Sequence, residues 1–195
     1  MKYTQIPETT FQELQLNAGI FCEDFDPSTG TVTGLFGATT GGGQFTATPT
    51  FEDFGDDIDN CPKNMMELKK LTEWAVTMAS TLLTLTPDSA KKLIAAADAD
   101  PDDETHIIPR RDVLLKDFGD IWWVGDYSDV NDDDDAGFIA IHLMNALNTG
   151  GFQIQSTDKA KGQFAFSFEG HVSMDAQDVV PFEIWVKAGE KDASQ

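Results

Sequence analysis

The sequence is poor in the residue types from which most catalytic and metal sites are built. It contains 2 cysteines and 3 histidines, and only 13 of its 195 residues are lysine or arginine. No two histidines have the His-x-x-x-His spacing, and none stands near a cysteine as a zinc motif requires. A nucleophile elbow, a phosphate-binding loop and a dinucleotide fingerprint are missing too. We therefore expect no enzymatic activity, no metal and no cofactor.

Long apolar runs are also missing. No stretch approaches the roughly 18 consecutive apolar residues of a membrane-spanning helix. Residues 1–8 show neither an apolar run nor a cleavage site of a signal peptide. The two cysteines, Cys22 and Cys61, allow a disulfide, but we favour the alternative of two reduced, buried thiols in a protein made in the cytosol. We expect a protein that is neither secreted nor associated with a membrane.

Acidic residues are what the sequence has in excess. Against the 13 basic residues stand 34 aspartates and glutamates, so the formal net charge is −21. This balance argues against wrapping nucleic acid, since phosphate contacts need lysine and arginine, and against anionic membranes. The roles that remain for so acidic a surface are to keep the protein soluble, to bind cations, or to prevent DNA from adhering. At 41% hydrophobic the chain can still bury a core, and its length fits one domain over residues 1–195.

An alternating pattern predicts β-structure near the C-terminus. Phe164, Phe166 and Phe168 alternate with small or charged residues, so the three rings share one face of a strand. Residues 182–187 form a second such strand. Further strands are expected over residues 31–36, 74–85, 120–127, 138–147 and 152–156. The fold class predicted is mostly β (α+β), a sandwich or barrel-forming sheet.

One helix is predicted to flank this sheet. Thr86 is a good N-cap, Pro87 suits the first helical position and Asp88 suits the first turn. The helix would carry an apolar stripe and end near Asp98, where an acidic loop over residues 98–104 begins. A shorter helical turn, capped by Asn64, is expected over residues 65–71.

A projecting arm is predicted over about residues 37–64. Gly41, Gly42 and Gly43 indicate a flexible turn after the strand that ends at residue 36. The threonine-rich segment 44–51 then reads as a strand, and Pro49 confines that strand to a sheet edge or to its own end. A strand, a glycine turn and an edge strand together indicate a long hairpin.

The acidic segments resemble calcium-binding loops only in part. Residues 129–135 place acids at alternate positions, but an EF-hand also needs glycine sixth and glutamate twelfth, where this chain has Asp134 and Ala140. The segment that starts at Asp98 fails in the same way. The rival function is an acidic β-domain that binds calcium or carbohydrate through residues 129–135 and an exposed tryptophan.

Trp122, Trp123 and His142 are the remaining candidates for a site. The two adjacent indoles should point to opposite faces of their strand, one into the core and the other either exposed or covered by the helix. An exposed indole would indicate a protein contact. His142 lies in an apolar strand and is expected to be a half-buried residue with a polar partner.

Two stretches are distinctive when taken together. Residues 37–50 read GATTGGGQFTATPT and are followed by FEDFGDDIDNCPKN (51–64); residues 161–171 read KGQFAFSFEGH, with VPFEI (180–184) close behind. In this order they resemble the major tail tube proteins of long, non-contractile-tailed phages and prophages of Gram-positive bacteria. The likeness covers most of the chain. Cys61 stands where the family would have a small residue.

The resemblance implies a virion structural protein, a β-sandwich with a flanking helix. Six copies would form a ring, rings would stack into a tube, and phage DNA would pass through the lumen without specific binding. Other partners would be tape-measure, tail-tip and terminator proteins, with assembly in the bacterial cytoplasm and residence in the virion tail. The arm would contact the next ring, through Gly41, Gly42, Gly43, Phe45, Phe51 and Phe54. Glu169 and Glu183 are the candidate carboxylates of the lumen wall.

Overall fold

The computed structural model describes residues 6–7, 9–128 and 136–189, and it is built mainly of antiparallel strands. The prediction of a mostly-β fold with one α-helix is confirmed. The elements in chain order are β1 (Gln15–Asp26), β2 (Thr31–Leu35), β3 (Thr39–Asp53), β4 (Lys69–Leu82), α1 (Pro87–Ile94), β5 (Ala97–Asp100), β6 (Asp103–Pro109), β7 (Gly119–Tyr127), β8 (Phe138–Asn148), β9 (Phe164–Glu169) and β10 (Phe182–Lys187), with short 3-10 turns at Thr10–Gln12 and Leu115–Asp117.

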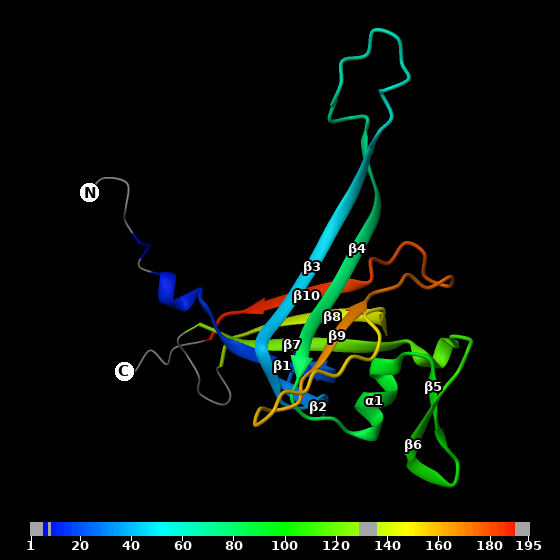
Figure 1. Cartoon of the computed structure of the whole chain (residues 1–195). Coiled ribbons are helices and arrows are strands. Elements are labelled where there is room, and N and C mark those ends of the chain that lie inside the picture. The colour runs from blue at the N-terminus through cyan, green and yellow to red at the C-terminus, as the bar shows by residue number, and fades with distance from the viewer. Residues whose placement is uncertain (1–5, 8, 129–135, 190–195) are drawn as a thin grey trace.

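Strand β8 belongs to both halves of the main sheet. Its first part, Phe138–Leu143, pairs with β7 on one side and β10 on the other. Its end, Leu147 and Asn148, pairs with β9. The order is therefore β2-β1-β7-β8-β9-β4-β3, with β10 added beside β8 (Figure 1). The half that holds β1, β7, β8 and β10 and the half that holds β9, β4 and β3 enclose the main core between them.

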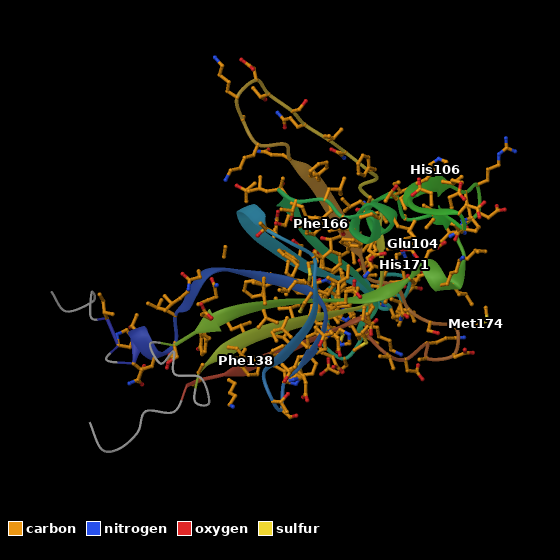
Figure 2. All side chains as sticks on the ribbon, turned by 90° about the horizontal axis from the view of Figure 1, so that it is seen from below. Glu104, His106, Phe138, Phe166, His171 and Met174 are labelled. Carbon is orange, nitrogen blue, oxygen red and sulfur yellow. The ribbon has the colours of Figure 1, made fainter. Side chains whose placement is uncertain are left out.

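The phenylalanines of β9 form the centre of that core, as their alternation predicted. Phe166 and Phe168 are buried, and Phe164 packs against the same cluster. The Phe166 ring lies 5.3 Å from the Phe21 ring and 5.4 Å from the Phe168 ring, measured between centroids. Figure 2 shows Phe166 among densely packed side chains. Edge-to-face and tilted rings of this kind add to the free energy gained by burying their area.

The two tryptophans of β7 do point to opposite faces, but neither is an exposed contact group. Trp123 packs against the main core, and its Nε1 donates a hydrogen bond to the carbonyl of Ala18. Trp122 is buried in a second cluster on the other face of the sheet, with Phe25 and Ala140. The aromatic rings of this second cluster cover Trp122, so neither alternative for the second indole, exposure or cover by the helix, is correct.

Helix α1 begins as predicted and ends earlier. The Thr86 side chain accepts a hydrogen bond from the backbone of Ser89, and the Ser89 hydroxyl is bonded to the backbone of Thr86 in return. Leu93 is the buried residue that attaches the helix to the core. The helix ends at Ile94, not near Asp98, because β5 begins at Ala97.

The segment predicted as an acidic loop is a separate hairpin, β5–β6. Arg110 pairs with two carboxylates at the open end of this hairpin. Its guanidinium group contacts the carboxylate of Asp117, and the Nε atom of Arg110 lies 2.6 Å from Asp98 Oδ2. In the turn, a backbone amide donates to Asp100, and the hydroxyl and then the amide of Thr105 donate to Asp103; these hydrogen bonds lower the pKa of both carboxyls. The acids are therefore used to build the hairpin, as aspartates commonly are in turns.

Two other local predictions are wrong. Residues 65–71 hold turns and the start of β4, which extends from Lys69 to Leu82, and no helical turn. Residues 152–156 make only one isolated bridge, between Gln155 and Gln163. The favoured prediction of two reduced cysteines is confirmed, but only Cys22 is buried, whereas Cys61 is partly exposed. Cys22 is buried, and burial, followed by the charges of Asp24 and Glu23, raises its pKa to about 11.

The core can be tested at Phe166. Removing the ring in Phe166→Ala should lower the free energy of unfolding by about 3–5 kcal/mol, because both burial and ring contacts are lost. Urea unfolding followed by tryptophan fluorescence measures the change. The same truncation at the half-exposed Phe54 should cost less than about 1 kcal/mol. Equal losses at the two positions would show that Phe166 is not central to the core.

Candidate functional site

The longest paired element of the molecule is the hairpin formed by β3 and β4, which we call the hairpin (39–82). Its strands pair from Thr39 opposite Leu82 to Asp53 opposite Lys69. One end lies in the core, and the other end stands well clear of the other strands (Figure 1). A projecting arm was therefore predicted correctly, although its position in the sequence differs from the prediction.

The hairpin leaves the core at one aromatic contact. Near the base, Val76 and Met78 are buried and Phe45 packs beside them. The last core contact is Trp74, whose ring lies 5.4 Å from the ring of Phe182. Beyond this point the side chains have no core to enter, and Phe51 is 53% exposed.

The three glycines lie inside β3, so the predicted turn at Gly41–Gly43 is wrong. The strand register passes from Thr40 opposite Thr81 to Gln44 opposite Ala79, which makes the glycines a bulge. Gly41 and Gly42 have φ of 78° and 77°, a region that glycine enters without strain. A Cβ on Gly43 would lie 2.7 Å from the Phe21 ring, so only glycine fits there. Their role is to bend the base of the hairpin against the core.

The turn of the hairpin is formed by residues 54–68, which we call the tip loop. Asp53 orders its two ends: Oδ1 accepts a hydrogen bond from the Gly55 amide and Oδ2 accepts one from the Asn64 amide, both at 2.9 Å. These bonds lower the pKa of the Asp53 carboxyl. The backbone amide of Phe54 also donates to the Leu68 carbonyl at 3.1 Å, closing the loop.

The far end of the hairpin exposes apolar side chains. Met66 is 83% exposed, and Phe51, Phe54 and Ile58 are each about half exposed. We call the set Phe51, Phe54, Ile58, Met65 and Met66 the tip surface. Lys69 lies 5.4 Å above the Phe51 ring and Lys70 lies 5.4 Å above the Phe54 ring. Exposed aromatic rings and methionines are typical of surfaces that bind other proteins.

The structure divides the six residues predicted for the arm contact. Phe51 and Phe54 are on the tip surface, as expected for a contact with a neighbour. Phe45 packs in the core, and Gly41–Gly43 form the bulge at the base. Ile58, Met65 and Met66 were missed, because the tip of the hairpin was placed at the glycines. Ile58 stands between Asp57 and Asp59, and this apolar residue among aspartates was the available indication of an exposed apolar loop.

The two candidate lumen acids lie on different surfaces. Glu169 ends β9 opposite Thr77 of β4, on the face turned away from Phe166 and Phe168. Glu183 is exposed on β10 opposite His142, on the face that holds the second cluster of rings. The structure does not bring them together.

The histidines and acids form no metal centre in the described ranges, where no three potential ligands cluster. His142 has the polar partner expected: its Nε2 lies 3.1 Å from Asp120 Oδ2, in range for an ion pair but not aligned for a hydrogen bond. Its ring stacks on Trp122 at 4.1 Å. Residues 129–135, on which the calcium alternative depends, lie outside the described residues.

Comparison with known proteins adds no assignment. A scan against models of protein families finds no match, and a search of curated proteins finds no similar sequence. Among the described residues, no helix has the length and apolar character needed to cross a bilayer.

The order of the tip loop should depend on the charge of Asp53. Hydrogen bonds from Gly55 and Asn64 lower the pKa of the Asp53 carboxyl below its ordinary value of 3.8. These bonds therefore stabilise the loop fully above pH 3.8, and their contribution is lost as the pH falls through the lowered pKa. In NMR titrations the Gly55 and Asn64 amide resonances should shift together, with a midpoint below 3.8. Asp53→Asn should abolish this shift and Asp57→Asn should leave it. A midpoint at the ordinary value would contradict the assignment.

Proposed function

We propose that the chain is a virion structural protein that assembles into rings, six copies each, which stack to form a phage tail tube. The observation that carries this proposal is the tip surface. Apolar side chains stand at the end of a hairpin remote from the core, where they make no contact with the core of their own chain. Such a surface is explained if a neighbouring subunit covers it in the assembled state.

The free edge of β3 supports assembly by strand pairing. In the described part of the chain β3 pairs with β4 alone, so its other edge leaves backbone groups without a strand partner along 15 residues. Exposed strand edges promote pairing with other chains, and closure into a ring or barrel removes them. Pro49 lies on this edge strand, as its missing N–H requires.

The residues on the outward face of β3, β4 and β9 support the proposal that this face lines a lumen through which DNA passes without binding. From Thr72 onward in β4, and throughout β3 and β9, there is no lysine or arginine. Hydroxyl groups and carboxylates occupy this face instead, among them Thr46, Thr48, Thr50, Thr77, Ser167 and Glu169. Carboxylates repel phosphate over about a Debye length, ~8 Å at physiological salt. In the proposed tube, Glu169 faces the lumen and Glu183 lies on another surface.

Electron microscopy of the purified chain tests the proposal. Concentrated protein should form rings or hollow tubes of uniform width, more readily at high salt, because salt screens the repulsion between subunits that each carry −21. Protein that stays monomeric at every salt concentration would contradict the proposal. Discrete monomers stabilised by calcium would favour the rival binding domain instead.

The role of the tip surface is tested by a double substitution. Phe54→Ser with Met66→Ser should raise the concentration needed for tubes at least about tenfold, since two apolar contacts are lost at each junction. Sedimentation and microscopy measure the assembled fraction, and the melting temperature should hardly change. Ile154→Ser with Leu115→Ser makes the same change at two other exposed residues and should assemble normally. Equal effects from both pairs would refute a specific role.

A further inference from the structure

A groove lies along β4 beyond the point where β9 ends. It has a volume of about 360 Å³ and is bounded by β4 residues 71–75 and by the chain that follows β9, residues 169–181. Figure 2 shows Met174 at the outer part of this second wall, away from the core. The volume is within the range of pockets that bind ligands. The groove belongs neither to the tip surface nor to the free edge of β3.

The wall that β4 contributes is an open strand edge. Strand β9 pairs with β4 only from Thr77 to Leu82, and the Gly170 amide adds one hydrogen bond to the Val76 carbonyl at 3.1 Å. In the part of the chain that the structure describes, no strand pairs with residues 71–75 on this side. Backbone direction alternates along a strand, so the N–H of Trp74 points to the same side as the Val76 carbonyl. These backbone groups are open to a further strand.

The opposite wall is held by hydrogen bonds of its own. Ser173 and Ala176 form an isolated bridge, and the amide of Val179 donates to the carbonyl of Ala176 at 3.1 Å. The His171 amide donates to the Met144 carbonyl of β8 at 3.3 Å, which attaches this wall to the body of the fold. The wall therefore keeps its place beside β4 without occupying the open edge.

The side chains that line the groove combine apolar groups with carboxylates. Four apolar lining residues are between 37% and 53% exposed, namely Leu71, Val172, Val179 and Val180. Three lining residues are acidic, namely Glu73, Glu169 and Asp178. None of the lining residues is lysine or arginine. An occupant that is both basic and apolar is complementary to this lining.

We propose that the groove binds an extended peptide of a partner protein, which adds a strand to the edge of β4 and alternates lysine or arginine with apolar residues. In this mode backbone hydrogen bonds supply affinity, and alternate side chains supply specificity. Side chains of the added strand point to opposite faces in turn, so one set meets Glu73 and the other meets Trp74. The peptide takes the place beside β4 that β9 holds further along the strand.

The inference concerns the single chain and does not depend on the formation of tubes. Glu73 stands on the same outward face as Ala75 and Thr77, and Thr77 is opposite Glu169. In the proposed tube the groove therefore opens toward the lumen, and a peptide enters it from that side. The carboxylates that repel phosphate there attract a basic peptide.

An NMR titration of the ¹⁵N-labelled full-length chain tests the site. The probe is a synthetic hexapeptide of alternating lysine and valine with blocked ends. It is added at low salt, where repulsion between subunits that each carry −21 keeps the chains apart. Amide resonances of residues 71–75 and 170–180 should shift together with a single saturation curve. Exchange of the Trp74 amide with solvent should slow at least about tenfold.

Three control peptides separate strand addition from the general attraction of cations to an acidic protein. A lysine–valine peptide that is N-methylated at every residue has the same charge but no backbone donors, and a lysine–serine peptide lacks the apolar side chains. Both should bind at least about tenfold more weakly than the probe. A glutamate–valine peptide should not bind.

Substitution of the acids tests which carboxylates recognise the peptide. Glu73→Gln with Asp178→Asn should weaken binding of the lysine–valine peptide at least about tenfold, as measured by isothermal titration calorimetry. Glu104→Gln with Asp158→Asn makes the same change of charge at two exposed residues outside the groove and should leave the affinity nearly unchanged.

The outcomes decide the proposal independently of tube assembly. Shifts confined to the groove, with loss of binding in the groove variant alone, support it. Shifts spread over the acidic surface, or equal binding of the N-methylated peptide, overturn it. Groove resonances that move with protein concentration in the absence of peptide would assign the groove to a second copy and also overturn it. Failure to form tubes would leave the peptide site standing.

Discussion

The packing of the β9 phenylalanines between the two halves of the sheet is the interaction on which the other features depend. Phe166 contacts the rings of Phe21 and Phe36, which come from different parts of the chain. The cluster also holds Val76 and Met78 of β4, so it fixes the base of the hairpin. Because the base is fixed in the core, the far end of the hairpin can extend without a core of its own and keep a defined direction.

The sequence predicted the features that arise from local alternation and capping. Strands β7, β8, β9 and β10 and the start of α1 follow from patterns of two or three residues, such as Thr86 and Pro87 at the helix N-terminus. Of the candidate site, the existence of a hairpin arm could be predicted, because apolar residues alternating with threonines indicate an edge strand, whereas Phe51 and Phe54 were named as contact residues through the resemblance alone.

What could not be predicted depends on contacts between distant residues. Three consecutive glycines fit a turn and a bulge equally well, and the choice was decided by Phe21, whose ring occupies the space beside Gly43. The acidic segment after α1 is a hairpin because Arg110 lies across its base, a contact that no local pattern reveals. Glu169 and Glu183 both alternate with phenylalanine, yet only the order of strands in the sheet shows that they face different surroundings.

The pairing of β1 with β7 has a consequence for the synthesis of the protein. The hydrogen bond between Trp123 and Ala18 joins residues that are 105 positions apart in the chain. Strand β1 leaves the ribosome long before its partner exists, and contacts at such separation form slowly. During that interval β1 keeps an open edge and an apolar face that invite wrong pairing between nascent chains. The same strand chemistry that suits the protein to assembly therefore makes the timing of its folding a condition for assembling correctly.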